Sequence, residues 1–269
     1  MNLVLQGISN SDVRQFSPDA ERISEKVFRI RNSKRDAAIE KWCGEHRVDY
    51  AWVPEGRRFA DLKLLAMDMD STLITIECID ELGDLAGCKG EIAGITAQAM
   101  RGEIDYPESL RRRVSYLKGL PEASLQTVYE ERLKLTEGAE VLLAACKRYG
   151  VKLLLVSGGF TFFTDRLKDR LGIDYTISNR LEVRDGKLTG NVLGDIVDAD
   201  AKARKFLEVV SELKIQKAQT VAIGDGANDL RMMTEAGLSV AFHAKPVVRA
   251  QADCAITYCG LDAVLNLFE

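Results

Sequence analysis

The chain is predicted to adopt an α/β fold, in which a Rossmann-like parallel sheet carries helices on both faces. Short apolar runs alternate with segments of helical periodicity from residue 62 onward, as expected for strands buried on both faces. A stretch of about sixty residues without a strand pattern interrupts this alternation and indicates an inserted helical cap. The mixed, charged start of the chain indicates a small N-terminal α/β appendage.

Runs of apolar and β-branched residues predict strands at 62–69, 151–156, 220–223, 239–242 and 254–257. Apolar residues at helical spacing predict core helices at 137–149, 160–171, 201–213 and 230–236. Gly150 and Gly237 are expected to end two of these helices. Asp185-Gly186, flanked by apolar residues, predicts a β-hairpin.

The cap is expected to contain helices at 79–87, 91–101, 106–117 and 123–133. We therefore divide the chain into an accessory N-terminal α/β segment (1–60), a catalytic core (61–76 and 137–269) and a helical cap (77–136).

Composition excludes several classes of protein. The chain of 269 residues has 37 Lys and Arg against 41 Asp and Glu, a balance that does not favour binding to nucleic acid or to an anionic membrane. No apolar run is long enough to span a bilayer and no signal-peptide pattern is present, so we expect a cytoplasmic protein. The only histidines are His46 and His243, so catalysis is expected to use carboxylates, hydroxyls and lysine. The six cysteines are expected to be reduced, apolar fillers.

Carboxylates follow two of the predicted strands. Asp68 and Asp70 come at the end of the first strand. Such a pair can simply form a turn or a helix cap, but at this edge of a parallel sheet it can also belong to a binding site. The segment from Gly224 to Asp229 follows the strand at 220–223 and is either a tight turn or a source of further ligands. Oxygen atoms of Asp68, Asp70 and Asp225 together suit Mg²⁺.

Two further features suit an anion. Ser157-Gly158-Gly159 lies between a strand and a helix, where it is either a flexible loop or a phosphate site with a hydroxyl and backbone N–H donors. Lys202 is expected in the first turn of a helix, where its positive charge is unfavourable next to the positive end of the helix dipole. This placement indicates either a binding role for Lys202 or an ordinary solvated lysine. Combined with the carboxylates, these groups would surround a phosphoryl group. One carboxylate would attack phosphorus, and the second would protonate the leaving alcohol and later activate water.

The four segments Asp68 to Thr72, Ser157 to Gly159, Lys202 and Gly224 to Asp229 resemble the four motifs of the haloacid dehalogenase superfamily. Within that superfamily, the chain resembles the phosphoserine phosphatases over about residues 62–269. Four further features carry this likeness: Glu77, the segment 108–114, Gly158-Gly159-Phe160 and Ala244-Lys245-Pro246. The resemblance implies a core of that superfamily's fold. It implies that Asp68 is the nucleophile, which forms an aspartyl phosphate, and that Asp70 is the general acid and base.

The resemblance also assigns the ligands. Mg²⁺ would be held by Asp68, Asp70 and Asp225, with Asp229 in support, and phosphate would be bound by Ser157, Gly158, Lys202 and Asn228. In the cap, Glu77 would bind the substrate's amino group and Arg113 its carboxylate, although Arg111 and Arg112 are adjacent. Tyr106 stands where the family is expected to have phenylalanine.

The implied reaction is the hydrolysis of the small molecule O-phospho-L-serine to L-serine and phosphate, the last step of serine biosynthesis. Another small-molecule phosphatase of the superfamily, or an amino-acid phosphotransferase that uses phosphoserine, is the enzymatic alternative. A non-catalytic amino-acid sensor is the alternative from another class. The sequence does not indicate an oligomeric state.

Overall fold

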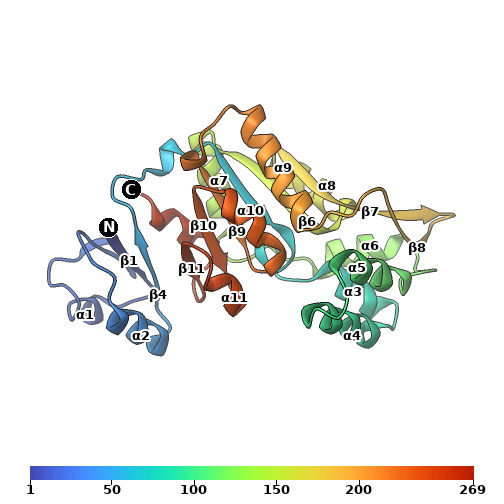
Figure 1. Ribbon diagram of the computed structural model, residues 1–269, viewed down its shortest axis with the longest axis horizontal. Coiled ribbons are helices and arrows are strands. Elements are labelled where there is room, and N and C mark those ends of the chain that lie inside the picture. Colours follow the sequence, from blue (N-terminus) through green and yellow to red (C-terminus); the bar gives the residue numbers. More distant parts are fainter.

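The computed structural model describes residues 1–269, and its core is a seven-stranded sheet (Figure 1). The strand order is β11-β10-β9-β5-β6-β7-β8, and every neighbouring pair is parallel except β7 with β8. The strands are β5 (Leu64–Asp68), β6 (Lys152–Phe160), β7 (Tyr175–Arg184), β8 (Lys187–Leu193), β9 (Thr220–Gly224), β10 (Leu238–Phe242) and β11 (Cys254–Ile256). The predicted α/β fold with a mainly parallel sheet is confirmed.

The central strands send alternate side chains into two hydrophobic cores, which explains their continuous apolar sequences. In β5, Leu65 and Met67 join one core with side chains of α7 and α8, whereas Leu64 and Ala66 join another with side chains of α9 and α10. The helices flanking the sheet are α7 (Ala139–Tyr149), α8 (Thr161–Leu171), α9 (Ala199–Glu212), α10 (Leu230–Glu235) and α11 (Pro246–Arg249). No helix in the protein combines the length and the apolar character needed to cross a membrane.

The two glycines expected to end helices have different roles. Gly150 ends α7 in the left-handed conformation, at φ 69°, as predicted. Gly237 does not act in this way, because α10 ends at Glu235 with Ala236 already extended. A Cβ atom on Gly237 would lie 2.2 Å from the carbonyl oxygen of Lys217, so this position requires glycine for close packing of two backbone segments.

The segment between β5 and β6 forms the predicted helical cap. Its helices are α3 (Cys78–Leu85), α4 (Lys89–Met100), α5 (Tyr106–Ser115) and α6 (Ala123–Thr127), the last continued by a wide helical turn at Val128–Arg132. They group at one end of the sheet, beside the β7–β8 hairpin (Figure 1).

The hairpin predicted from Asp185-Gly186 is present, and it supports the cap. Both turn residues have positive φ, 52° and 70°, as a two-residue turn between Arg184 and Lys187 requires. Backbone N–H groups of Gly119 and Glu122 donate to the hairpin at 2.8 and 2.9 Å, and the hairpin's Leu188 donates to Leu120 at 2.9 Å. The hairpin therefore holds the loop between α5 and α6 in place.

The N-terminal segment forms the small α/β appendage expected from the sequence, built on a sheet of its own. It has the βαββαβ order of a ferredoxin-like unit, with four antiparallel strands in the order β2-β3-β1-β4. Its elements are β1 (Asn2–Gln6), α1 (Asn10–Val13), β2 (Glu21–Ser24), β3 (Val27–Ile30), α2 (Ala37–His46) and β4 (Asp49–Val53). Every residue of β2 is exposed, so no apolar alternation marks that strand in the sequence.

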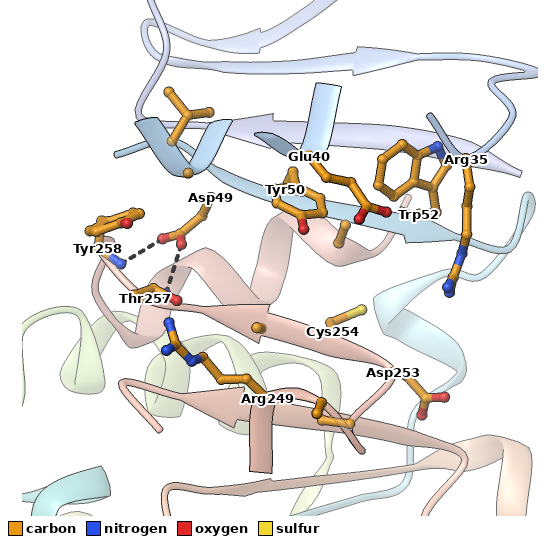
Figure 2. Close-up of a pocket in the computed structure, with 16 residues that line it drawn as sticks. Arg35, Glu40, Asp49, Tyr50, Trp52, Arg249, Asp253, Cys254, Thr257 and Tyr258 are labelled. Atoms are coloured by element: carbon orange, nitrogen blue, oxygen red, sulfur yellow. Dashed lines mark hydrogen bonds between the residues drawn. The ribbon is translucent and has the colours of Figure 1, made fainter. Parts of the chain in front are cut away.

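One buried carboxylate ties the N-terminal unit to the core. Asp49, at the start of β4, is 3% exposed and accepts backbone N–H bonds from Thr257 at 2.7 Å, Tyr258 at 2.9 Å and Cys259 at 2.8 Å (Figure 2). The loop after β11 therefore depends on this residue, because the three N–H groups make no other hydrogen bond.

We expect Asp49→Ala to lower the free energy of unfolding by about 3 kcal/mol, because three N–H groups lose a charged acceptor in a buried place. Chemical denaturation followed by circular dichroism measures this change. Asp19→Ala, at an exposed aspartate of the same unit, is the control and should change stability by less than about 0.5 kcal/mol. Equal stability of the two variants would contradict the structural role of Asp49.

Candidate active site

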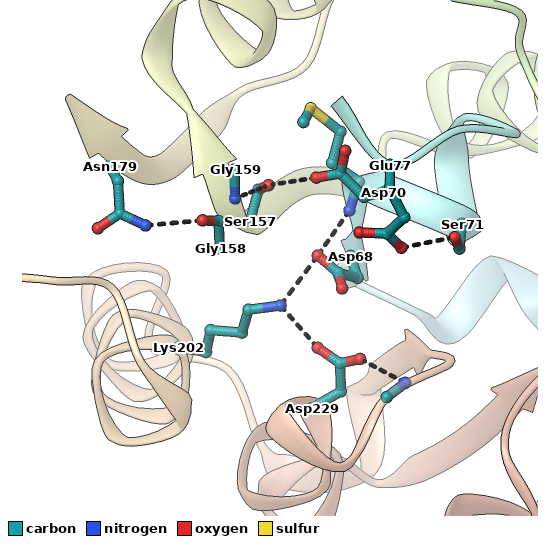
Figure 3. A network of polar contacts seen from close by, with 12 residues as sticks. Asp68, Asp70, Ser71, Glu77, Ser157, Gly158, Gly159, Asn179, Lys202 and Asp229 are labelled. Atoms are coloured by element: carbon teal, nitrogen blue, oxygen red, sulfur yellow. Dashed lines mark hydrogen bonds and ion pairs between the residues drawn. The ribbon is translucent and has the colours of Figure 1, made fainter. Parts of the chain in front are cut away.

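The carboxyl ends of β5, β6 and β9 meet below the cap, and Figure 3 shows several of the residues selected from the sequence gathered there, among them Asp68, Asp70 and Lys202. A cavity of about 530 Å³ opens at this edge. Its lining includes Asp68, Asp70, Glu77, Arg113, Gly158, Asp225 and Asn228. The remaining candidates, Ser157, Lys202 and Asp229, are buried and contact the two aspartates or their neighbours.

Asp68 and Asp70 are positioned by a sharp turn directly after β5. Ser71 has φ 56°, which reverses the chain at the cost of a left-handed backbone in a non-glycine residue. Asp68 Oδ1 accepts the N–H of Met69 at 2.8 Å, and no hydrogen bond engages Asp68 Oδ2. Asp70 accepts the N–H of Cys78 at 2.8 Å and the hydroxyl of Ser157 at 3.2 Å. Burial raises the pKa of both carboxyl groups, most strongly that of Asp68, whose pKa the neighbouring Asp229 raises further.

Lys202 lies beneath this turn and pairs with two carboxylates. Its side chain is 1% exposed, and Nζ lies 2.9 Å from Asp68 Oδ1 and 2.8 Å from Asp229 Oδ1. Burial alone would lower the Lys202 pKa, but the charges of Asp229 and Asp68 outweigh it and hold that pKa above its usual value. This pairing explains why a lysine stands in the first turn of α9, against the helix dipole.

The Ser157-Gly158-Gly159 loop is held by contacts on both sides. The Ser157 hydroxyl accepts the N–H of Gly159 at 2.8 Å. The carbonyl of Gly158 accepts Asn179 Nδ2 at 2.8 Å and the hydroxyl of Tyr106, from the cap, at 3.0 Å. Asn179 was not predicted, because no local pattern distinguishes it within β7.

Three carboxylates converge in a group that suits a cation. Oxygen atoms of Asp68, Asp225 and Asp229 lie within 4.8 Å of one another. Burial, followed by the charge of Asp229, raises the pKa of Asp225 to about 6. Two lysines, Lys202 and Lys245, face three carboxylates here, and an oxygen-only donor set with excess negative charge fits a hard divalent cation.

This group differs from the predicted ligands Asp68, Asp70 and Asp225. The side chain of Asp70 is not a member, because its two oxygens are turned toward Cys78 N–H and the Ser157 hydroxyl. Asp229 is a member, although it was expected only to support the site. The role of each residue as a ligand stays a prediction.

The cap contributes two opposite charges to the same cavity. Glu77, just before α3, accepts the hydroxyl of Ser71 at 2.7 Å. The Glu77 carboxylate can be reached from the cavity, although surrounding atoms displace much of the water around it. This burial, together with the charge of Asp70, raises the pKa of Glu77 to about 7. Arg113 lines the cavity and is 9% exposed, whereas Arg111 and Arg112 point to solvent.

Ser109 is a further cavity residue that the sequence did not single out. It lies one turn before Arg113 on α5 and is 1% exposed, and its Oγ has no hydrogen-bond partner. A buried hydroxyl without a partner is costly unless a bound molecule supplies one.

Histidine and cysteine take no part in the cavity wall. Neither His46 nor His243 lines it, and all six cysteines are free thiols, five of them buried. The interpretation of the cysteines as reduced fillers is confirmed by their burial and their lack of disulfides.

A divalent cation should stabilise the folded chain through the three converging carboxylates. We expect MgCl₂ at about 100 times its Kd to raise Tm by about 5 °C, because binding to the folded state alone contributes about 2.7 kcal/mol. Asp225→Asn should remove most of this shift in a thermal unfolding assay. Asp200→Asn, at an exposed aspartate in the first turn of α9, should keep it. Loss of the shift in both variants would count against the assigned position.

Comparison with known proteins supports this arrangement. A family model described as haloacid dehalogenase-like hydrolase matches residues 65–234. A protein of Polaromonas sp. named phosphoserine phosphatase is 59% identical over 217 residues, covering 79% of this chain and 92% of that protein. A Haemophilus influenzae protein of the same name is 47% identical over 229 residues, covering 85% of this chain and 73% of its own.

Solved structures show the same likeness. A probable phosphoserine phosphatase of Vibrio cholerae superposes with a TM-score of 0.86 at 39% identity, over 99% of this chain and 85% of that one. A substrate-bound phosphoserine phosphatase complex superposes with a TM-score of 0.73 at 40% identity, over 77% of this chain and 99% of that one. Given the matched family model and these relatives, this chain belongs to the haloacid dehalogenase-like hydrolases.

Proposed function

We propose that this protein is a Mg²⁺-dependent phosphoserine phosphatase, which hydrolyses O-phospho-L-serine to L-serine and phosphate. One observation carries the proposal: a single cavity has Asp68 and Asp70 at its floor and the opposite charges of Glu77 and Arg113 in its cap wall, with the buried Lys202 paired to Asp68 behind the floor. The floor suits a phosphoryl group, and the cap suits the ammonium and carboxylate of an amino acid. The high identity to relatives named phosphoserine phosphatase supports the same substrate.

The first chemical step forms an aspartyl phosphate on Asp68. Oδ1 of Asp68 is engaged by Lys202 and the Met69 N–H, so Oδ2 is the oxygen left to attack phosphorus. As the new oxygen–phosphorus bond forms, the bond from phosphorus to the seryl oxygen breaks. Asp70, whose pKa is raised by burial, carries the proton that this leaving oxygen takes up.

The second step returns the enzyme to its initial state. Asp70, now a carboxylate, takes a proton from a water molecule that attacks the phosphorus of the aspartyl phosphate. The bond from phosphorus to Asp68 breaks, and phosphate leaves. Mg²⁺ bound among the carboxylates would supply positive charge that offsets the repulsion between Asp68 and an anionic phosphate.

The phosphate is held from two sides. Lys202 places its positive charge next to Asp68, and we assign Ser157, Gly158 and Asn228 to the phosphoryl oxygens. Asp229 orients Lys202 and accepts the N–H of Gly226 at 3.1 Å, so it fixes the loop that presents Asp225.

The cap selects the amino-acid part of the substrate. We assign Glu77 to the ammonium and Arg113 to the carboxylate, with the unpartnered Ser109 hydroxyl as an additional hydrogen-bonding group. In this assignment residues 77–136 form the selecting cap, 61–76 with 137–269 the catalytic core, and 1–60 an accessory unit.

We expect Asp68→Asn to lower the rate of phosphate release from phosphoserine at least about 10³-fold, because an amide is not a nucleophile here. Phosphate is measured with Mg²⁺ and with EDTA across a panel of small phosphoesters, and EDTA should abolish release by the unaltered chain. Asp200→Asn is the matched control and should retain activity, while circular dichroism checks that both variants fold.

Two outcomes of that assay would change the proposal. Near-normal turnover by Asp68→Asn would exclude the aspartyl phosphate mechanism. A new phosphoester formed when homoserine is added would identify a phosphotransferase, which is the alternative that the same site chemistry allows.

The raised pKa of Glu77 predicts a pH-dependent preference for substrates that carry an ammonium group. Glu77 is ionised only above its pKa of about 7, so recognition of the ammonium is present above that pH and lost below it. The ratio of kcat/KM for phosphoserine to kcat/KM for phosphoglycolate, which lacks the ammonium, should therefore rise with pH. Glu77→Gln should make this ratio independent of pH, whereas the control Glu81→Gln, one turn along α3, should leave its pH dependence unchanged. A ratio that does not change with pH in the unaltered chain would contradict the role of Glu77.

A further inference from the structure

One hydrogen bond joins the cap directly to the floor of the active-site cavity. The hydroxyl of Tyr106, the first residue of α5, donates to the Gly158 carbonyl at 3.0 Å, and both residues line the cavity. Burial raises the pKa of Tyr106 to about 12, so the hydroxyl keeps the proton that it donates. A phenylalanine at this position would have no hydroxyl, so the bond depends on the tyrosine of this chain.

The acceptor of this bond is fixed to the core. Asn179 of β7 donates to the same Gly158 carbonyl at 2.8 Å, as Figure 3 shows. Asn179 is itself 1% exposed, and its side-chain oxygen accepts the N–H of Val197 at 2.8 Å. The Gly158 carbonyl therefore has a defined position, and the Tyr106 hydroxyl meets a fixed point of the floor.

The donor of the bond lies on a well-defined helix start. The side chain of Asp105 accepts the N–H of Glu108 at 2.8 Å and so caps α5. Pro107 follows in the first turn and restricts the backbone there. These two features fix the backbone that carries Tyr106, so its hydroxyl can hold this end of α5 at a set height above the floor.

The other end of α5 is attached to the β7–β8 hairpin, which Figure 1 shows beside the cap. Just after the helix, the N–H of Gly119 donates to the carbonyl of Leu188 at 2.8 Å. Gly190 of β8 approaches so closely that a Cβ atom there would lie 3.2 Å from the carbonyl oxygen of Ser115. Helix α5 is therefore held at two points, by the Tyr106 hydroxyl at its start and by the hairpin at its end.

Arg113 lies between these two attachments. It follows Tyr106 by seven residues, which is about two helical turns and about 10 Å of helix, so both side chains belong to the same face of α5. That face also carries Ser109 and Leu110, and all four residues line the cavity. The height of α5 above the floor therefore sets how far the Arg113 guanidinium stands from Asp68.

Glu77 does not share this dependence on α5. The hydroxyl of Ser71, in the sharp turn after β5, donates to the Glu77 carboxylate at 2.7 Å and ties it to the core. A change in the height of α5 would therefore move Arg113 and leave Glu77 in place. Any selection that α5 exerts acts on the carboxylate end of the substrate.

We propose that the Tyr106 hydroxyl is a positioning group that selects substrates by length. This inference rests on the proposed function and deepens it. With phosphate at Asp68 and the carboxylate at Arg113, the bond from Tyr106 fixes the span that a substrate must cover. One methylene group separates Cα from the ester oxygen in O-phospho-L-serine, and two separate them in O-phospho-L-homoserine. The longer molecule has the same charged groups, but it fits only if α5 moves away from the floor, which breaks the bond.

Tyr106→Phe removes one oxygen atom and tests the inference directly. The values of kcat/KM for O-phospho-L-serine and O-phospho-L-homoserine are measured by phosphate release in the presence of Mg²⁺. In the unaltered chain their ratio should favour phosphoserine by about 10- to 200-fold, the usual discrimination for one methylene group, and in Tyr106→Phe it should fall at least about fivefold. The fall should come from both sides, because kcat/KM drops for phosphoserine and rises for phosphohomoserine. A merely structural role of the hydroxyl would lower both values together.

Tyr116→Phe is the matched control. Tyr116 ends the same helix and is 47% exposed, so the loss of its hydroxyl should leave the ratio unchanged. Circular dichroism checks that both variants fold, and Tyr106→Leu, which also lacks the hydroxyl, takes the place of Tyr106→Phe if that variant does not fold.

Three outcomes would overturn the inference: an unchanged ratio in Tyr106→Phe, an equal loss of kcat/KM for both substrates, or the same change in Tyr116→Phe. Absence of phosphoserine turnover in the unaltered chain would overturn the proposed function and this inference with it. Phosphoserine turnover with an unchanged ratio in Tyr106→Phe would overturn this inference alone, so the two failures are distinct.

Discussion

The ion pairs of Lys202 with Asp68 and Asp229 are the interaction on which the rest of the site depends. All three side chains are nearly excluded from water, so each would be costly to bury alone. Lys202 comes from α9, Asp68 from the end of β5, and Asp229 from the turn after β9, so one ammonium group holds three distant segments together. Asp229 then fixes Gly226, which places Asp225 at the cavity.

The cavity has excess negative charge, and this excess links its electrostatics to its chemistry. Burial, reinforced by neighbouring carboxylates, raises the pKa of Asp68, Asp225 and Glu77 together. Such a site favours ligands that bring positive charge, which suits both a divalent cation at the floor and a substrate ammonium at the cap. The cap is coupled to the floor through Gly158, whose carbonyl accepts Tyr106 from α5 and Asn179 from β7. A Cβ atom on Gly158 would lie 2.2 Å from the Tyr106 hydroxyl, so this coupling depends on glycine.

Much of the fold could be predicted because its signals are local. Apolar runs marked the buried strands, and Asp185-Gly186 marked the hairpin, since both depend on residues close in sequence. Strand β2 was not predicted because all its residues are exposed and show no apolar pattern. The full length of β7 was not predicted because that strand is only half-buried. Asn179 carried no signal either, since its importance comes from contacts with Gly158 and with the N–H of Val197, both far from it in sequence.

The sequence by itself determined which residues gather at one edge of the sheet, because parallel strands bring their carboxyl ends together wherever they lie in the chain. Only the tertiary structure decided where those side chains point. Arg113 faces the cavity while the adjacent Arg111 and Arg112 face solvent, and Asp229 rather than the Asp70 side chain joins Asp68 and Asp225. The physical reason is that a side chain's direction depends on the partners packed against it, such as Cys78 and Ser157 for Asp70, and those partners come from other segments of the chain.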